Sequence, residues 1–280
     1  MMENHSPTHS LPAHSSLDGR VAIVTGSTQG LGEGVAHLFA ARGIAGLVVT
    51  GRNAERGAKV KAALEARGVK TLFVEADLAS VDDALSIVAE ADGAFGRIDV
   101  LVNSAGITDR GTIWDTSPEL FDAMFAVNVR APFFLMQEAL KVMKREKTEG
   151  AVVNIISMSG HGGQSFITAY SASKGALATL TRNVAYSVMN HRIRVNGLAI
   201  GHMNTPGEDR IMKTYHGAQD GWLAQAEETK PFGRLLEVDE VARAVAYLAS
   251  GESGMMTGSI IDFDQQVRGT GDAPPPPPVV

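Results

Sequence analysis

The chain has 280 residues, 44% of them hydrophobic and 20% charged, which suits one globular domain or two small ones and excludes disorder of the whole chain. Its net charge of -6 comes without any basic block, so the electrostatic pattern of a nucleic-acid-binding protein is absent and a small-molecule partner is favoured. The absence of cysteine excludes disulfides, thiolate nucleophiles and cysteine-bound metals and favours a reducing compartment, so we expect a cytoplasmic protein.

Short β-branched runs alternate with longer helical patterns, the order typical of a parallel sheet with crossover helices. We expect strands at Val21–Thr25, Leu47–Thr50, Thr71–Glu75, Val100–Asn103, Val152–Ile156, Arg194–Leu198 and Ser259–Phe263. We expect helices at Gly30–Arg42, Ala54–Arg67, Val81–Ala94, Pro118–Glu146, Ala169–Asn190, Glu208–Glu228 and Val238–Ala249. Several strands are continuous apolar runs, as expected where helices cover both faces. The sequence therefore predicts an α/β fold with a doubly wound, parallel, seven-stranded sheet.

The two ends of the chain differ in composition from the part between them. Residues 1–16 are polar and lack the apolar core of a secretory signal, so we interpret them as a disordered extension. Residues 270–280 contain a polyproline run that cannot pack as a helix or a central strand, and we interpret them as a Pro-rich tail. No linker interrupts residues 17–269, which predicts one domain there. No apolar run approaches the roughly 20 residues that span a membrane.

A glycine-rich turn follows the first predicted strand and precedes the first predicted helix. It reads Gly26-Ser27-Thr28-Gln29-Gly30-Leu31-Gly32. Gly26 allows the tight turn, Gly30 lets backbone N–H groups approach a pyrophosphate, and Gly32 permits close packing of helix on strand. A glycine-rich turn alone is weak evidence and is often only a turn. Its position between strand and helix favours a phosphate-binding site.

The end of the second predicted strand bears on the choice between NAD and NADP. A carboxylate there would hold the ribose 2′-hydroxyl of NAD, but the residues are Gly51 and Arg52. A guanidinium can bind a 2′-phosphate with two parallel hydrogen bonds, which favours NADP over NAD. The alternative is that Arg52 only lies at a solvated helix start.

Tyr170 and Lys174 stand four residues apart in a predicted helix, so they share one face of it. A neighbouring ammonium favours phenolate over phenol, which would bring the pKa of the tyrosine towards the range useful for acid–base catalysis. Ser157 closes the fifth predicted strand at the same rim, where its hydroxyl could bind a substrate oxygen. Taken alone, a Tyr and a Lys at this spacing are more often structural.

These motifs together resemble the short-chain dehydrogenase/reductase family, in its compact single-domain branch. The resemblance covers about residues 17–267. It rests on Thr25-Gly26-x-x-x-Gly30-x-Gly32, Asn103-Ser104-Ala105-Gly106, Asn128, Ser157, Tyr170-x-x-x-Lys174, Arg194-Val195-Asn196 and Thr205-Pro206. It implies that residues 17–269 form a Rossmann-type catalytic domain that transfers a hydride between NAD(P)(H) and a secondary alcohol or carbonyl compound.

The resemblance also implies a role for each matching residue. Tyr170 would be the general acid in reduction and the general base in oxidation, Ser157 would position the substrate oxygen, and Lys174 would hold the nicotinamide ribose and lower the pKa of the tyrosine. Asn128 would anchor a proton-relay water, unless it only satisfies local backbone groups. The expected cofactor contacts are Gly26, Ser27, Gln29, Gly30, Leu31, Gly32, Arg52, Asp77, Leu78, Asn103, Ala105, Gly106, Tyr170, Lys174, Gly201 and Thr205.

We expect substrate choice in the segment from His202 to Phe232, which is typical of a lid that excludes water from the reaction. Its polar groups would suit a sugar, a polyol or another hydroxylated compound, although a solvated helix face explains most of them equally well. The candidate substrate contacts are Ser159, His161, His202, Tyr215 and Trp222. No ligand spacing suggests a metal, so none is predicted.

The resemblance further implies a homotetramer built through Pro118–Glu146 and Ala169–Asn190. Two other functions fit the sequence less well. A non-catalytic NAD(P)-binding regulator or scaffold would gain nothing from Ser157, Tyr170 and Lys174 together. A sugar-nucleotide epimerase or dehydratase would need a larger substrate domain after the sheet.

Overall fold

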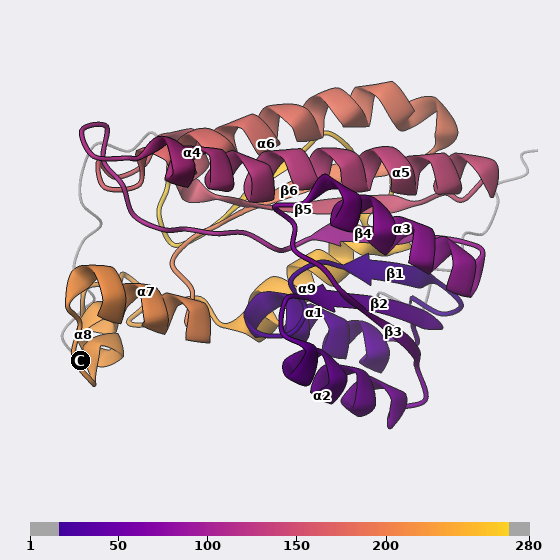
Figure 1. Cartoon of the computed structure of the whole chain (residues 1–280), viewed down its shortest axis with the longest axis horizontal. Coiled ribbons are helices and arrows are strands. Elements are labelled where there is room, and N and C mark those ends of the chain that lie inside the picture. Colours follow the sequence, from indigo (N-terminus) through magenta and orange to yellow (C-terminus); the bar gives the residue numbers. More distant parts are fainter. Residues whose placement is uncertain (1–16, 269–280) are drawn as a thin grey trace, which may run out of the picture.

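The computed structural model describes residues 17–268 and confirms the predicted fold class (Figure 1). The predicted extension 1–16 and tail 270–280 lie outside the described residues. The strands are β1 Val21–Val24, β2 Gly46–Gly51, β3 Lys70–Glu75, β4 Val100–Asn103, β5 Ala151–Ser157, β6 Arg194–Ile200 and β7 Ile260–Phe263. The helices are α1 Gly30–Ala41, α2 Ala54–Glu65, α3 Val81–Phe95, α4 Pro118–Phe125, α5 Ala131–Arg145, α6 Thr168–Val188, α7 Pro206–His216, α8 Trp222–Glu228 and α9 Val238–Ala249.

All seven strands form one parallel sheet in the order β3-β2-β1-β4-β5-β6-β7. The chain builds outward from β1 to β3 and then crosses back to place β4 on the other side of β1. In open parallel sheets, ligands bind beyond the carboxyl ends of the strands at such a reversal. The topology therefore predicts a site where β1 and β4 end.

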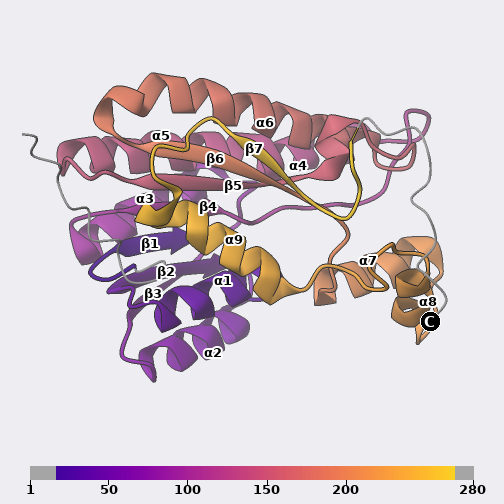
Figure 2. The same cartoon turned by 180° about the vertical axis from the view of Figure 1, so that it is seen from behind.

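The sheet lies between two layers of helices, with α1, α2 and α9 on one face and α3, α5 and α6 on the other (Figures 1 and 2). Alternate residues of one strand enter opposite cores: Val100 and Val102 pack with α1 and α9, whereas Leu101 packs with α3 and α5. Burial on both faces explains why the strands read as continuous apolar runs.

Several helices begin where a short polar side chain satisfies a free backbone N–H group. Asn53, Ser80 and Ser117 accept hydrogen bonds from backbone N–H groups in the first turns of α2, α3 and α4. At the start of α9, Glu237 and Glu240 form a reciprocal capping box.

The single helix predicted over Glu208–Glu228 is wrong. Gly217 and Gly221 have φ angles of 62° and 89°, in the left-handed region that glycine adopts without steric cost, and the helix ends there. The segment folds as two short helices, α7 and α8, in a separate lobe beside the sheet (Figure 1). We refer to residues 202–232, which contain this lobe, as the lid.

The long helix predicted over Pro118–Glu146 is present but irregular. A π-helical turn, Ala126–Arg130, separates α4 from α5 without breaking the helix axis into two directions (Figure 1). A π-turn holds one residue more than the same length of α-helix and is frequent at functional sites. Asn128, a predicted site residue, lies in the middle of this turn.

Candidate active site

A cleft of about 1850 Å³ opens at the carboxyl ends of the central strands, where the topology predicts it. It is lined by the turn after β1 and by the ends of β2, β4, β5 and β6. Residues of α6, of the lid and of the segment 264–267 complete it. Most of the residues expected from the sequence line this cleft: Gly26, Gln29, Gly30, Leu31, Gly32, Arg52, Asp77, Leu78, Ala105, Gly106, Ser157, Ser159, Tyr170, Lys174, Gly201, His202 and Thr205.

The glycine turn leaves backbone N–H groups open to the cleft. Gly26 and Gly30 have φ angles of 64° and 58°, and a Cβ on Gly32 would lie 2.5 Å from the carbonyl oxygen of Gly26. Gln29, which precedes α1, makes no side-chain capping bond. The N-terminus of α1 therefore keeps free donors and a positive dipole end beside the cleft, a donor set that fits a dinucleotide pyrophosphate.

Two guanidinium groups lie at the end of β2. Arg52 and Arg56 both line the cleft, and within residues 17–268 neither guanidinium forms a hydrogen bond or an ion pair. Asp77 and Leu78 line the same end. Arg56 was missed from the sequence, although it stands one helical turn after Arg52 and the spacing could have identified it.

Ser27 and Asn103, expected as cofactor contacts, do not line the cleft. The Ser27 hydroxyl donates to Val24 O at 2.7 Å and accepts from the backbone N–H of Thr50 at 2.9 Å, which ties β1 to β2. The Asn103 amide donates to Asn154 Oδ1 at 2.8 Å, between β4 and β5. Both side chains form hydrogen bonds that link neighbouring strands beneath the cleft.

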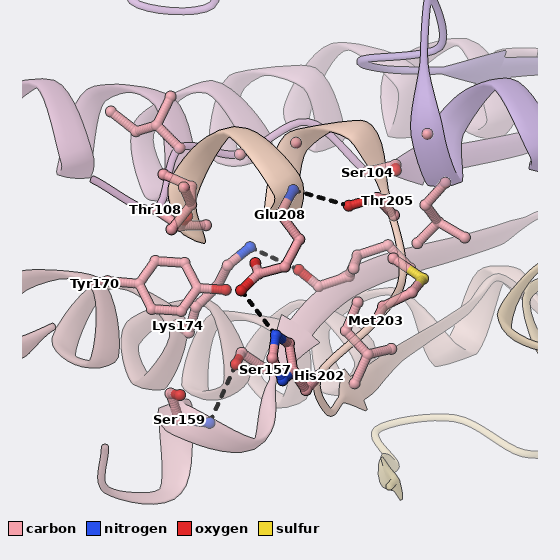
Figure 3. A pocket seen from close by; sticks show the side chains of 18 of the residues that line it. Ser104, Thr108, Ser157, Ser159, Tyr170, Lys174, His202, Met203, Thr205 and Glu208 are labelled. Atoms are coloured by element: carbon pink, nitrogen blue, oxygen red, sulfur yellow. Dashed lines mark hydrogen bonds and ion pairs between the residues drawn. The ribbon is translucent and has the colours of Figure 1, made fainter. Parts of the chain in front are cut away.

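Ser157, Tyr170 and Lys174 converge at the other end of the cleft (Figure 3). Ser157 ends β5, and its Oγ accepts a hydrogen bond of 3.1 Å from the backbone N–H of Ser159. One turn after Tyr170, the buried Lys174 Nζ donates to Ile155 O at 2.9 Å and lies 5.8 Å from the centre of the tyrosine ring. The strand end and the first turns of α6 thus hold three polar groups in one place.

The electrostatics of this group differ from the sequence expectation. The pKa of Tyr170 is raised above its usual value, mainly by burial. The interaction with Ser157 lowers this pKa, the charge of Glu208 raises it, and the charge of Arg110 lowers it, but burial outweighs them. Burial also lowers the pKa of Lys174, to about 8. The net pKa of Tyr170 is thus raised rather than lowered, and the Lys174 ammonium, which was expected to lower it, is itself disfavoured by burial and bound to a backbone carbonyl.

Asn128 lies below the cleft rather than in its wall. Its amide closes a pair of bonds with the backbone of Ile107, accepting from the N–H and donating to the carbonyl at 3.0 Å each, and also donates to Ser173 Oγ at 3.1 Å. A Cβ on Gly106 would lie 3.2 Å from Asn128 Oδ1 and 3.4 Å from Lys174 Nζ. Asn128 therefore adjoins the lysine, and its role in a proton relay stays a prediction.

The five candidate substrate contacts divide into two groups. Ser159 and His202 line the cleft, whereas His161, Tyr215 and Trp222 do not.

The three that do not line the cleft have partners elsewhere. His161 lies between Asp262 at 2.6 Å and Arg268 at 2.8 Å. Tyr215 donates to Asp109 at 2.7 Å, which ties α7 to the loop after β4. The buried Trp222 donates to Asp209, and its ring stacks on that of His202 with centroids 6.2 Å apart, so it supports the site without reaching the cleft.

The cleft also contains charged residues that the sequence did not mark as contacts: Glu208, Arg110 and His216. Glu208 accepts a 2.8 Å hydrogen bond from His202, and Arg110 donates to His216 at 3.0 Å. Burial raises the pKa of Glu208, but the hydrogen bond from His202 and the charge of Arg110 outweigh it and hold the net pKa below its usual value. Glu208 is therefore ionised at neutral pH.

Within residues 17–268, no cluster of three or more histidines or carboxylates could hold a metal ion. None of the helices in that range is both long enough and apolar enough to cross a bilayer.

Comparison with known proteins shows that this chain is similar to oxidoreductases. The family model described as enoyl-(acyl carrier protein) reductase matches residues 26–265. An uncharacterized oxidoreductase of Thermotoga maritima is 36% identical over 89% of this chain and 97% of its own. Galactitol 2-dehydrogenase of Agrobacterium fabrum is 30% identical over 89% of this chain and 97% of its own.

A solved structure extends the likeness to three dimensions. The 3-oxoacyl (acyl-carrier-protein) reductase of Agrobacterium tumefaciens, with NADP bound, has a TM-score of 0.82 and 27% identity, over 94% of this chain and 100% of that one. With the sheet order, the glycine turn and the Ser157, Tyr170 and Lys174 group already described, these likenesses confirm the resemblance. The chain belongs to the short-chain dehydrogenase/reductase family and is an NAD(P)-dependent oxidoreductase that acts on CH–OH groups.

Proposed function

We propose that the protein interconverts a secondary alcohol and its ketone on a hydroxylated substrate such as a sugar or a polyol, with Tyr170 as general acid and base. The observation that carries this proposal is the convergence of Tyr170, Ser157 and Lys174 at one end of a cleft whose other end fits a dinucleotide. The name of one relative, galactitol 2-dehydrogenase, supports a polyol.

The cofactor, held by the glycine turn, supplies the acceptor or donor of the hydride. In oxidation, the Tyr170 oxygen removes the proton of the substrate hydroxyl as the hydride leaves the carbon that bears it; in reduction, the same oxygen returns a proton to the carbonyl oxygen. Ser157 orients the substrate oxygen by hydrogen bonding. Lys174, fixed by Ile155 O, would hold a ribose hydroxyl, and Asn128 would support a proton path beside it.

The raised pKa of Tyr170 gives the two directions opposite dependence on pH. Oxidation requires the phenolate, so its rate rises as the pH approaches the tyrosine pKa from below. Reduction requires the phenol, which is the dominant form at neutral pH.

Replacement of Tyr170 tests the proposal. Tyr170→Phe should lower kcat by about 100-fold or more, the usual effect of losing an acid–base group, while NADPH binding measured by fluorescence stays within a few-fold. Tyr247→Phe makes the same change at an exposed position of α9 outside the cleft and should leave both quantities unchanged. Near-normal turnover by Tyr170→Phe would contradict the assignment.

We also propose NADP as the preferred cofactor. The support is the unpaired guanidiniums of Arg52 and Arg56, which both line the cleft at the end of β2. Arg52→Ala and Arg56→Ala should each weaken NADPH binding by about 10-fold or more, as for a lost charge-assisted bond, and leave NADH binding nearly unchanged. Arg67→Ala, at an exposed position after α2, is the matched control. Equal loss for both cofactors would refute the preference.

Three coarser expectations accompany this function. We propose that residues 17–269 act as one catalytic domain, which turnover by that fragment would test. We propose a homotetramer through α4, α5 and α6, which expose Phe121, Phe133 and Tyr186; light scattering after gel filtration would detect a monomer instead. We propose a cytoplasmic location, which cell fractionation would test.

A further inference from the structure

The lid places a carboxylate directly opposite the proton-transferring tyrosine. Glu208 is the third residue of α7, where the Thr205 hydroxyl accepts its backbone N–H and leaves the side chain free to point into the cleft. Its carboxylate lies between the Tyr170 hydroxyl and His202 (Figure 3). After burial, the charge of Glu208 is a smaller cause of the raised pKa of Tyr170, which is consistent with this proximity.

Only one of the two carboxylate oxygens has partners. Oε1 accepts a 2.8 Å hydrogen bond from His202 and lies 3.9 Å from Arg110 Nη2. Oε2 receives no hydrogen bond from any residue in the range 17–268. The Glu208 side chain is only 20% exposed. Oε2 is not among the fully buried polar atoms that lack a partner, so it faces the cleft, where a donor of the substrate can bind it.

The surroundings decide which donor fits. An ammonium would be attracted by Glu208 but repelled by the guanidinium of Arg110, which is held in place by Thr108 O at 2.9 Å and by His216. A carboxylate would be attracted by Arg110 but repelled by Glu208. A hydroxyl is neutral, donates to Glu208 and still accepts from a neighbouring cation. The charge pattern therefore selects a hydroxyl group.

The position decides where this hydroxyl lies on the substrate. If the reacting oxygen lies at Tyr170 and Ser157, the Glu208 carboxylate lies on the same side of the cleft, next to the Tyr170 hydroxyl (Figure 3). Oxygens on adjacent carbons lie about as far apart as two hydrogen-bonded atoms, so one ligand can meet both groups at once.

We propose that Glu208 is a specificity-determining residue that selects vicinal diols, and α-hydroxy ketones in the reverse direction, by accepting a hydrogen bond from the second hydroxyl. The proposal rests on the function proposed above and deepens it, since it assigns the substrate class to one atom of this chain.

Matched pairs of simple alcohols test it: butane-2,3-diol against butan-2-ol, and cyclohexane-1,2-diol against cyclohexanol. The wild-type protein should prefer the diol of each pair by about 10-fold or more in kcat/KM, as for a hydrogen bond to a charged group. Glu208→Gln should reduce this preference by about 10-fold, since the neutral amide is a weaker acceptor. The two alcohols of a pair use the same Tyr170, so a change in its pKa cancels in the ratio.

Glu228→Gln is the control, because it makes the same substitution at an exposed position of the lid outside the cleft, and it should keep the wild-type ratio. A wild-type ratio near one with both pairs overturns the proposal, and it does so even if Glu208→Gln does not fold. Turnover of neither member of either pair, in either direction, by protein that binds NADPH would instead overturn the proposed function, and this inference with it.

Discussion

Burial of Lys174 lowers the stability of the fold, and replacement of this proposed catalytic residue should show it. Burial lowers its pKa from the usual 10.5 to about 8. The folded protein thus binds fewer protons than the unfolded chain between these values, and stability rises with pH across that window. At pH 7 the charged form costs the folded state about 3 kcal/mol, and near pH 9.5 about 1.5 kcal/mol.

Lys174→Met keeps the length of the side chain and removes the charge. It also removes the hydrogen bond to Ile155 O, at a cost of about 1 kcal/mol. The variant without cofactor should therefore be more stable than the wild type by about 2 kcal/mol at pH 7 and by about 0.5 kcal/mol near pH 9.5, while its turnover collapses. Urea unfolding followed by tryptophan fluorescence at both pH values measures the difference.

The control is Lys59→Met, which removes a lysine whose side chain is 73% exposed and paired with Glu55. Its stability should change by no more than about 0.5 kcal/mol at either pH. The reasoning fails if Lys174→Met is less stable than the wild type at pH 7, or if its advantage does not shrink as the pH rises.

Three further predictions concern the frame of the site. Gly32→Ala places a Cβ 2.5 Å from Gly26 O, so the glycine turn must shift. Isothermal titration should show NADPH binding weakened by about 10-fold or more, for an overpacking cost of about 1–3 kcal/mol. Unchanged affinity would contradict a phosphate-binding role of the glycine turn. Asn128→Ala leaves two backbone groups of Ile107 without their partner, and the urea midpoint should fall by the equivalent of about 3 kcal/mol; a loss below about 1 kcal/mol would show that water replaces the amide. Trp222→Phe removes the 2.8 Å bond to Asp209, and hydrogen exchange should quicken within 206–228 while the global urea midpoint stays constant; uniform quickening would show that the lid is not a separate unit.

The fold could be predicted from the sequence because short stretches of sequence mark its strands and helix starts. Apolar runs such as Val21–Val24 and Val100–Val102 mark strands buried on both faces, and short polar residues such as Asn53 and Ser80 mark helix starts. The proximity of the proposed catalytic pair was predictable for a different reason, since Tyr170 and Lys174 are neighbours on one helix turn.

The structure of the lid was predicted less accurately, because the spacing of its charged residues alone does not determine it. Charged residues continue at helical spacing through Glu208–Glu228, and only the left-handed backbone at Gly217 and Gly221 ends the helix. The part that Glu208 plays depends on His202 and on Arg110, which is about 100 residues away in the chain. Neither contact of Glu208 can be predicted from the residue pattern of the helix that contains it.

Electrostatics were the least predictable part. The spacing of Tyr170 and Lys174 suggested a lowered tyrosine pKa, but the sign depends on how deeply both groups are buried and on the carboxylate that the lid brings near. The spacing of two residues on one helix face predicts that their side chains meet. The dielectric around the two side chains, which sets the direction of their pKa shifts, depends on how the whole protein packs around them.

The π-helical turn at Ala126–Arg130 has a consequence for how such a protein can change over evolutionary time. A π-turn is an α-helix that has gained one residue. Loss of a single codon in this stretch would restore a regular helix and rotate Asn128 by about 100° about the axis, away from Ile107 and the neighbourhood of Lys174. The seven strands and both helix layers would remain. If Asn128 supports the proposed proton path, one deletion would thus turn a working dehydrogenase into a silent dinucleotide-binding scaffold, and one insertion would reverse the step.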